Sequence, residues 1–342
     1  LSKLFREKRF SEIIFLIESN SDEKSSEILN ILAISRLSLE RSKNSFELAL
    51  REFKEAYLKE KKTQNGLNAA INYLNASAEL YDYLDHHDTS DYSKVFFEQA
   101  IIFFKEAQLN FEFNPKLISA GIRIFKRLNY LEIVFDYYKK LYEKDNLTLQ
   151  TLSSWIFLNN YNNEWKQSDY YTFTQLLEKY IPEISNEKLK PISTVKNKKI
   201  KIGFLSSDIN KYHSITFFFK TVCLLYDRNT FEIYIFSNHR IEDEGFINFQ
   251  KLVDRTFNIS KLNDIEAINF IRSHNIDIMF DLMGLSSSNR ISLFKHRLAP
   301  AQVSWLGYCN TLGIKNMDYL IADPYLIHQN ELIQYSEKVL FL

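Results

Sequence analysis

The first half of the chain carries apolar residues at steps of three and four positions. Phe10, Ile13, Ile14 and Ile17 form one such stretch, and similar stretches follow it up to about residue 148. This spacing places apolar side chains on one face of an α-helix. We therefore predict consecutive amphipathic helices over residues 1–148.

A small–aromatic–small spacing recurs within this helical half. It occurs at Ala49–Ala56 and again at Ala100–Ala107, and a related spacing at Ile133–Leu141 follows about one 34-residue period later. The pattern resembles the second helix of a degenerate tetratricopeptide repeat. The signature residues of that repeat's first helix are absent, so an irregular helical domain stays open as the alternative.

The pattern changes near residue 200. Apolar runs rich in β-branched and aromatic residues occupy positions 200–206, 231–236, 277–282, 302–306 and 319–322, and helical stretches occupy 215–226, 264–274 and 289–296. Strands that alternate with helices predict a parallel sheet with helices on both faces. We assign residues 149–199 to a helical lead-in and linker, whose last part, residues 186–199, is polar and lacks periodicity. Residues 200–342 form the predicted α/β domain.

Polar residues and glycines follow three of the predicted strands directly, at Ser206–Asp208, Gly284–Ser286 and Gly307–Tyr308. In an open parallel sheet, the carboxyl ends of the strands border the ligand crevice. These three loops are therefore expected to converge on one edge of the sheet.

Charge and composition narrow the function classes. The 43 basic and 43 acidic residues balance, which argues against a nucleic-acid binder. No apolar run approaches the length of a bilayer span, so we expect no membrane partner. The two cysteines, Cys223 and Cys309, provide neither a disulfide framework nor zinc spacing, and two reduced thiols predict a cytoplasmic protein.

The loop after the first strand holds the most informative polar pair. Asp208 follows a buried strand, and His213 precedes the next helix. A carboxylate and an imidazole at a crevice can transfer protons or position a diphosphate, and a helix start near Ser214 offers amides to an anion. The alternative is structural, with Asp208 capping a turn and His213 at a helix end. The adjacent His86 and His87 do not share a helix face and predict no metal site.

Several ordered blocks of the second half resemble the O-linked N-acetylglucosamine transferase family, which is glycosyltransferase family 41 and includes the plant SPINDLY branch. The blocks are WIFLNNY (155–161), KIGFLSSD (201–208) followed by His213, DLMGLSSSNRISLFKHRLAPAQVSWLGYCNTLG (281–313), MDYLIAD (317–323) and YSEKVLFL (335–342). The resemblance covers roughly residues 150–342. In this family, helical repeats precede the catalytic region, which suits the first half.

The resemblance implies an inverting transferase with two Rossmann-like lobes, the GT-B arrangement, of which residues 200–342 form the first. Such an enzyme moves N-acetylglucosamine from UDP-N-acetylglucosamine to protein Ser or Thr hydroxyls without a metal or other cofactor. The helical repeats would bind the protein or peptide acceptors. The residues that match the family's functional positions are Asp208 (proposed base), His213 (beside the sugar and phosphate), Ser214 and Ile215 (donor side), and Leu306, Gly307 and Tyr308 (donor-contact loop).

The sequence also departs from the family pattern. His213 lies five residues after Asp208, where the family usually shows four. Leu285 and Asn162 stand where bacterial members often have histidines, and Cys309 replaces a proline. A catalytically silent interaction module therefore stays open, as does the same fold with UDP-glucose as donor and Asn as acceptor. We also expect a second lobe beyond Leu342 and no activity of residues 1–342 alone.

Overall fold

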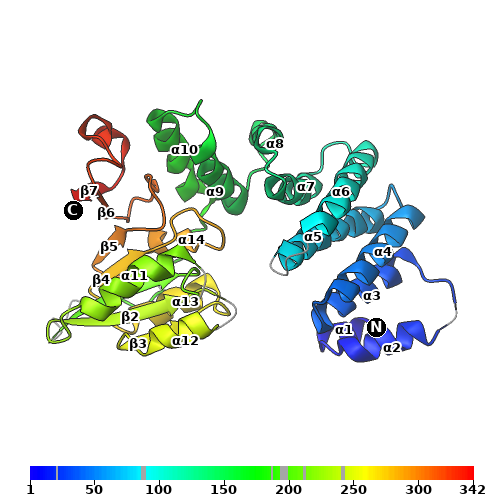
Figure 1. Ribbon diagram of the computed structural model, residues 1–342, viewed down its shortest axis with the longest axis horizontal. Helices are drawn as coiled ribbons and strands as arrows, with labels where there is room; N and C mark the ends of the chain where they lie inside the picture. The colour runs from blue at the N-terminus through cyan, green and yellow to red at the C-terminus, as the bar shows by residue number, and fades with distance from the viewer. Residues whose placement is uncertain (21, 86–89, 186–187, 193–198, 211–212, 240–242) are drawn as a thin grey trace. The chain divides into compact units, whose positions relative to one another are not determined.

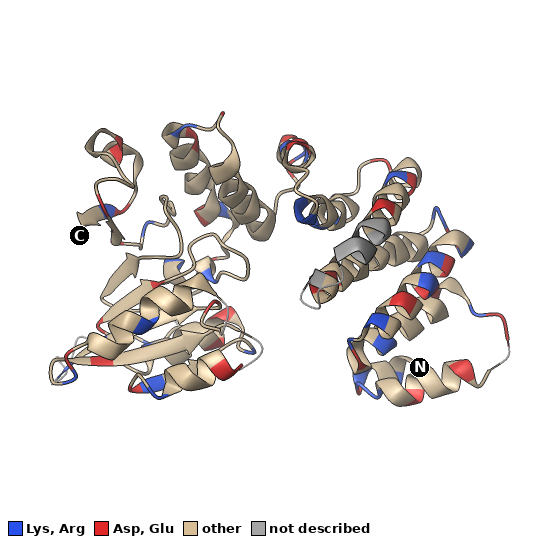
Figure 2. Cartoon of the chain, viewed as in Figure 1, with Lys and Arg blue, Asp and Glu red and all other residues tan. Residues whose placement is uncertain are grey.

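The computed structural model describes residues 1–20, 22–85, 90–185, 188–192, 199–210, 213–239 and 243–342. The chain divides into two compact units, Leu1–Leu147 and Thr148–Leu342. Each unit has its own secondary-structure class (Figure 1). Lys and Arg are interspersed with Asp and Glu along the helices of both units, as Figure 2 shows.

The described secondary structure of the first unit is helical, as the periodicity predicts. Its helices are α1 (Ser2–Arg6), α2 (Phe10–Glu18), α3 (Ser26–Leu39), α4 (Lys43–Lys59), α5 (Gln64–Asp85), α6 (Ser90–Asn110), α7 (Pro115–Arg127) and α8 (Leu131–Glu143). Neighbouring helices along the chain pack against each other, and α5 also packs against α7. The unit is thus a stack of consecutive helices.

The recurring spacing falls on α4, α6 and α8. The triads at Ala49–Ala56 and Ala100–Ala107 are fully buried, with each of their key side chains at most 1% exposed. Small residues there let a neighbouring helix approach closely. A Cβ atom built on Gly121 of α7 would lie only 2.3 Å from the Phe104 ring, which shows how closely α6 and α7 approach.

The third stretch, Ile133–Leu141 on α8, follows the spacing only in part. Leu141 is buried, but Ile133 is 40% exposed, and Val134 and Tyr138 enter the core instead. The difference lies in which of two adjacent tyrosines is buried. Tyr138 enters the core, while Tyr137 stays partly exposed and hydrogen-bonds Gln108 through its hydroxyl at 3.0 Å.

Asn114 provides a test of local helix stability in this unit. Its Oδ1 accepts hydrogen bonds from the backbone N–H groups of Lys116 and Leu117, both at 3.1 Å, at the start of α7. Asn114→Ala is expected to lower the free energy of unfolding by about 1 kcal/mol, because it leaves these donors without a side-chain cap. Asn114→Asp retains an acceptor oxygen and is the matched control. Equal losses in the two variants, measured by urea denaturation, would contradict the capping role.

The second unit is an α/β domain preceded by two helices. Its elements are α9 (Leu149–Leu158), η1 (Asn159–Tyr161), α10 (Gln167–Tyr180), β1 (Ile200–Ser206), α11 (Ser214–Leu225), β2 (Phe231–Ser237), α12 (Glu244–Gln250), β3 (Arg255–Asn258), α13 (Asp264–Arg272), β4 (Ile278–Asp281), α14 (Ile291–Lys295), β5 (Ala301–Ser304), β6 (Tyr319–Ala322), η3 (Gln329–Gln334) and β7 (Lys338–Phe341).

Among the described residues, seven strands form one sheet and pair in parallel, in the order β3-β2-β1-β4-β5-β6-β7. The chain runs outward from β1 to β3, then returns to the other side of β1 to begin β4. This reversal makes the carboxyl ends of the neighbouring strands β1 and β4 the topological switch point, where ligands bind in such sheets. The predicted Rossmann-like architecture is confirmed.

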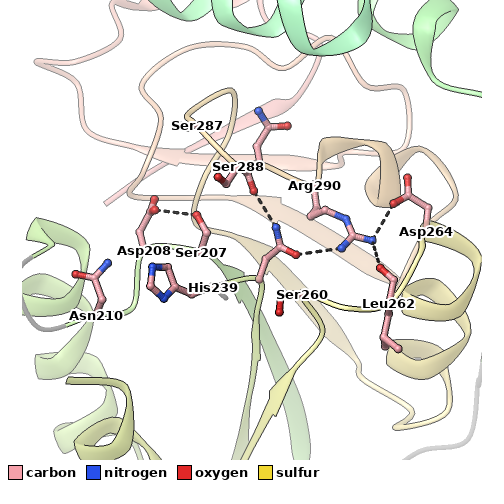
Figure 3. Close-up of a pocket in the computed structure, with 12 residues that line it drawn as sticks. Ser207, Asp208, Asn210, His239, Ser260, Leu262, Asp264, Ser287, Ser288 and Arg290 are labelled. Atoms are coloured by element: carbon pink, nitrogen blue, oxygen red, sulfur yellow. Dashed lines mark hydrogen bonds and ion pairs between the residues drawn. The ribbon is translucent and has the colours of Figure 1, made fainter. Parts of the chain in front are cut away.

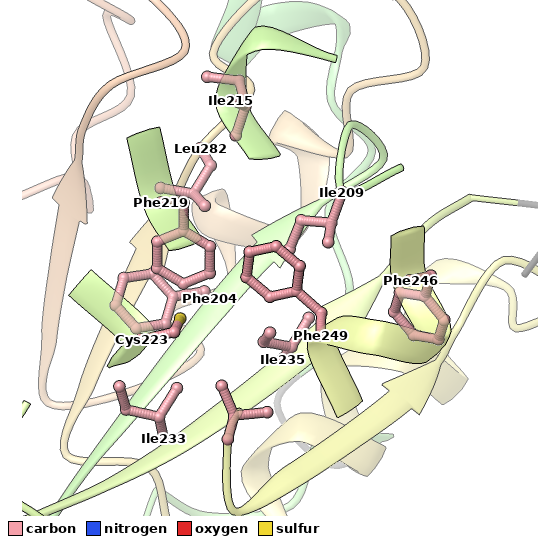
Figure 4. Close-up of a cluster of buried hydrophobic side chains, with 11 residues drawn as sticks. Phe204, Ile209, Ile215, Phe219, Cys223, Ile233, Ile235, Phe246, Phe249 and Leu282 are labelled. Carbon is pink, nitrogen blue, oxygen red and sulfur yellow. The ribbon is translucent and has the colours of Figure 1, made fainter. Parts of the chain in front are cut away.

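The main core cluster lies between the sheet and helices α11 and α12. Figure 4 shows the rings of Phe204, Phe219 and Phe249 gathered there, with Ile233 and Ile235 of β2 beneath them. Alternate residues of β2 face the opposite side, where the ring of Phe236 packs edge-on against that of Phe270 in α13, with the centroids 6.4 Å apart. Helices therefore cover both faces, as the continuous apolar strands predict.

Part of the expected linker is bound to the sheet domain. The backbone N–H of Lys190 donates to Asn269 of α13 at 2.7 Å, and the Asn269 amide donates to the Lys188 carbonyl at 2.8 Å. Arg272 also donates to the Lys190 carbonyl. Residues 186–187 and 193–198 of the linker lie outside the described residues.

Candidate functional site

Asp208 lies immediately beyond β1, at the carboxyl edge of the sheet. Its backbone N–H donates to Ser206 Oγ at 2.9 Å, and its Oδ1 accepts a hydrogen bond from Ser207 Oγ at 2.8 Å. The side chain is 17% exposed. The turn therefore fixes one carboxylate oxygen and leaves the other to face the crevice.

His213 is the N-cap residue of α11. Its Nδ1 accepts the backbone N–H of Ile215 at 3.3 Å, and its own N–H donates to Asn210 Oδ1 at 3.1 Å. An accepting Nδ1 assigns the proton of the neutral ring to Nε2. Nε2 lies 3.9 Å from Asp208 Oδ2, so the structure brings the two predicted catalytic residues together. Residues 211–212 between them lie outside the described residues.

The two residues predicted on the donor side, at the start of α11, differ in exposure. Ser214 is exposed, whereas Ile215 is 6% exposed and belongs to the core cluster with Phe219 and Leu282. The Ile215 amide is already bound by the His213 ring. In this structure Ile215 thus supports the loop by packing, and Ser214 is the accessible member of the pair.

The loop after β5 begins with a tight turn. Leu306 has φ = +71°, and the Gly307 N–H donates to the Trp305 carbonyl at 2.9 Å. A leucine with positive φ is uncommon and costs conformational energy, so the surrounding packing must hold it in place. Leu306 packs against the core cluster that contains Ile215.

Tyr308, the third residue predicted in this loop, points into the interior. It is 7% exposed, and its ring stacks on Phe157 of α9 with the centroids 6.1 Å apart. Burial raises the pKa of its phenol. Tyr308 therefore holds the loop in place through its buried ring.

A cavity of about 610 Å³ opens beside Asp208, at the carboxyl ends of β1 and β2 (Figure 3). It is lined almost entirely by polar side chains. They are Ser207, Asp208, Asn210, Asn238, His239, Ser260, Asp264, Ser287, Ser288, Asn289 and Arg290, together with Leu262. The described lining is rich in groups that both donate and accept hydrogen bonds, as a polar substrate requires.

Arg290 organises the far wall of this cavity. Its guanidinium donates to Asp264 Oδ1 at 2.8 Å, to Asn238 Oδ1 at 3.0 Å and to the Leu262 carbonyl at 3.3 Å. Asp264 thereby neutralises the only arginine in the described lining. Of the cavity lining, the sequence pattern predicted Asp208 as a site residue but missed Asn238, His239, Ser260 and Asp264. The rule that polar residues follow buried strands, applied to the end of β2, would have found Asn238 and His239.

Leu285 and Asn162, two of the positions that depart from the family pattern, have structural roles here. Leu285 is 2% exposed and packs in the interior. The Asn162 amide donates to Asn159 at 2.9 Å, and its Oδ1 accepts the Glu164 N–H at 3.0 Å, so it caps a turn.

The described residues contain no group of three or more His, Cys, Asp or Glu side chains arranged to hold a metal ion. His86 and His87 lie outside them. No described helix combines the length and apolarity of a bilayer-spanning segment.

Comparison with known proteins agrees with this geometry. The model of glycosyl transferase family 41 matches residues 179–342. A probable UDP-N-acetylglucosamine–peptide N-acetylglucosaminyltransferase SPINDLY from Solanum lycopersicum is 27% identical over 135 residues, which are 38% of this chain and 14% of the relative. A probable transferase of the same description, SEC from Arabidopsis thaliana, is 25% identical over 146 residues, 42% of this chain and 15% of the relative.

A solved structure extends the similarity of fold to nearly the whole chain. A mutant of the Thermobaculum terrenum O-GlcNAc transferase matches with a TM-score of 0.74 and 18% identity, covering 94% of this chain and 58% of that one. The matched regions thus span only about one seventh of the curated plant relatives. Residues 179–342, which contain the sheet domain and part of the segment leading into it, are similar to glycosyl transferase family 41.

Proposed function

We propose that this chain provides the acceptor-activating lobe of a transferase that moves N-acetylglucosamine from UDP-N-acetylglucosamine to Ser or Thr hydroxyls of proteins. The observation that carries the proposal is the Asp208–His213 pair, with 3.9 Å between Oδ2 and Nε2, at the edge of a polar cavity. The pair lies at the carboxyl edge of β1, next to the switch point between β1 and β4.

The chemistry divides between these two residues. The acceptor hydroxyl oxygen forms a bond to the anomeric carbon as the bond from that carbon to the diphosphate oxygen breaks, with inversion. Asp208 takes the hydroxyl proton, and the bonding electron pair leaves with UDP. We assign stabilisation of the developing negative charge to the Nε2–H of His213 and to the N-terminal end of α11 at Ser214.

The helical unit would bind protein acceptors, since stacked helices present extended surfaces to peptides. We place the reaction in the cytoplasm, where free thiols such as Cys223 and Cys309 persist. Leu285 and Asn162, which hold structural positions, favour the second candidate, a silent interaction module of the same fold.

The test is a transfer assay with the protein expressed from its complete reading frame. Radiolabelled UDP-N-acetylglucosamine and UDP-glucose are each offered with matched peptides that contain Ser, Thr or Asn as the single acceptor. N-acetylglucosamine on the Ser and Thr peptides is the expected product. Glucose on the Asn peptide would replace the donor and acceptor assignment, and tight donor binding without any transfer would establish the silent module.

A further inference from the structure

Asp281, the last residue of β4, is a carboxylate in the interior that the proposed reaction does not use. It is 2% exposed. Its Oδ1 accepts the backbone N–H of Met283 at 3.1 Å, and its Oδ2 accepts that of Gly284 at 2.8 Å. One buried side chain therefore fixes the turn Leu282–Gly284, with one oxygen bound to each of two amides.

This turn contacts the loop that holds the proposed base. The backbone N–H of Ser207, the neighbour of Asp208, donates to Met283 Sδ at 3.1 Å, and the contact is buried. The Leu282 N–H in turn donates to the Leu205 carbonyl of β1 at 3.1 Å. The position of the Asp208 turn thus depends on where Met283 lies.

On its other side the same turn contacts the Leu306–Tyr308 loop. A Cβ atom on Gly307 would lie 1.7 Å from the Leu282 carbonyl oxygen, and one on Gly284, whose φ is +56°, would lie 2.1 Å from Tyr308 Cβ. The Trp305 N–H also donates to the Asp281 carbonyl at 3.0 Å. The turn therefore contacts the loop twice, through the backbone of Leu282 at Gly307 and through the backbone of Gly284 at the Tyr308 side chain.

We propose that Asp281 is a positioning residue, which holds the Leu282–Gly284 turn and thereby sets the placement of Asp208 relative to the Leu306–Tyr308 loop. Its structural part stands on the contacts above, and only its catalytic consequence rests on the proposed function. Asp281 does not touch the reacting atoms. It acts through Met283 on one side and through Gly284 on the other.

The charge state of Asp281 offers a readout for this role. The pKa of Asp281 is raised to about 7, chiefly because the side chain is buried. The nearby negative charge of Asp208 adds to the rise, and the two amide hydrogen bonds oppose it. Asp208 is the charged group of the described residues that acts on it, and Tyr308 is the buried titratable group in the adjoining loop. The ionised form accepts both amides, whereas protonation occupies one oxygen. The turn is therefore expected to loosen as the pH falls through 7.

Trp305 is the probe for the protonation of Asp281, because the backbone N–H of Trp305 donates to the Asp281 backbone carbonyl. The chain, labelled with 5-fluorotryptophan, contains three fluorine probes, Trp155, Trp165 and Trp305. We expect the ¹⁹F resonance of Trp305 to titrate with a midpoint near pH 7, while those of Trp155 and Trp165 serve as internal controls. A Trp305 resonance that does not change between pH 5 and 9 in the unmodified chain would overturn the proposal.

Variants assign the titration to its source. Asp281→Asn, an uncharged isostere, should abolish the Trp305 midpoint, and His213→Gln should retain it. Asp208→Asn should move the midpoint to lower pH, because it removes the charge that raises the pKa of Asp281. A midpoint that survives in Asp281→Asn but disappears in His213→Gln would assign the titration to the imidazole and overturn the proposal. If Asp281→Asn does not fold, the proposal is still tested by the Trp305 titrations of the unmodified chain and of the His213→Gln and Asp208→Asn variants.

The catalytic consequence is measured separately in the complete protein. Asp281→Asn is expected to lower kcat at least tenfold with little change in KM, and to remove the step near pH 7 from the pH profile of kcat. Met283→Leu, which removes the sulfur acceptor but keeps the volume, should lower kcat less and leave that step in place. An unchanged kcat and pH profile in Asp281→Asn would refute the positioning role. If the protein transfers no sugar at all, the proposed function fails, while the fluorine titration still tests the structural part.

Discussion

Asp208→Asn is expected to lower kcat/KM for sugar transfer by about 10²–10⁴-fold in the complete protein, the range that a positioned general base contributes. The amide has the shape of the carboxylate and can still accept the Ser207 hydroxyl, which donates at 2.8 Å in the present structure. It cannot take the proton of the acceptor hydroxyl. Steady-state kinetics with a fixed Ser peptide measures the loss.

Two controls separate proton transfer from simple misplacement. Donor affinity, measured by calorimetry, should change little in Asp208→Asn, since Asp208 acts on the acceptor side. Ser207→Ala removes one hydrogen bond to the carboxylate and should lower kcat/KM only by about tenfold, given the usual worth of such a bond. Undiminished turnover in Asp208→Asn would exclude Asp208 as the base.

Gly307→Ala is expected to lower the free energy of unfolding of the sheet domain by about 3 kcal/mol or more. The added Cβ would lie 1.7 Å from the Leu282 carbonyl oxygen and 2.6 Å from its carbon. Backbone atoms cannot rotate aside as a side chain can, so the whole loop would have to move. Thermal or urea denaturation of the chain measures the loss.

Gly203→Ala is the matched control for this clash. Its Cβ would lie 2.6 Å from Met279 Sδ, and the thioether can change its rotamer. We expect a smaller loss than for Gly307→Ala, with the sheet retained. An equal or larger loss for Gly203→Ala would mean that the closeness to Leu282 does not limit the loop.

The architecture of the sheet domain was predictable because its strands are buried on both faces and read as continuous apolar runs. The observed bounds of β1 and β6 agree with those runs to the residue. β3 was missed because Arg255–Asn258 contains four residues of mixed character at the edge of the sheet. α12 was missed because its seven residues are too few to show a helical period.

The candidate site was predictable only where a polar or titratable residue directly follows the end of a buried strand. Asp208 meets that condition and lies at the cavity. The inward orientation of Tyr308 was not predictable, because it depends on Phe157, a helix residue far away in the sequence. The same holds for the neutralisation of Arg290, whose partner Asp264 belongs to another helix. Local patterns do not encode such pairings.

The position of β1 in the middle of the sheet has a consequence for synthesis on the ribosome. Its partner on one side, β2, follows shortly, but its partner on the other side, β4, is encoded far downstream, as the 76-residue separation of Lys201 and Asp277 shows. At about 5–20 residues per second, that separation corresponds to about 4–15 s of translation. During this interval the apolar edge of β1 has no strand beside it. Nascent chains stalled within residues 240–275 are therefore expected to recruit chaperones or aggregate more than chains stalled after β5.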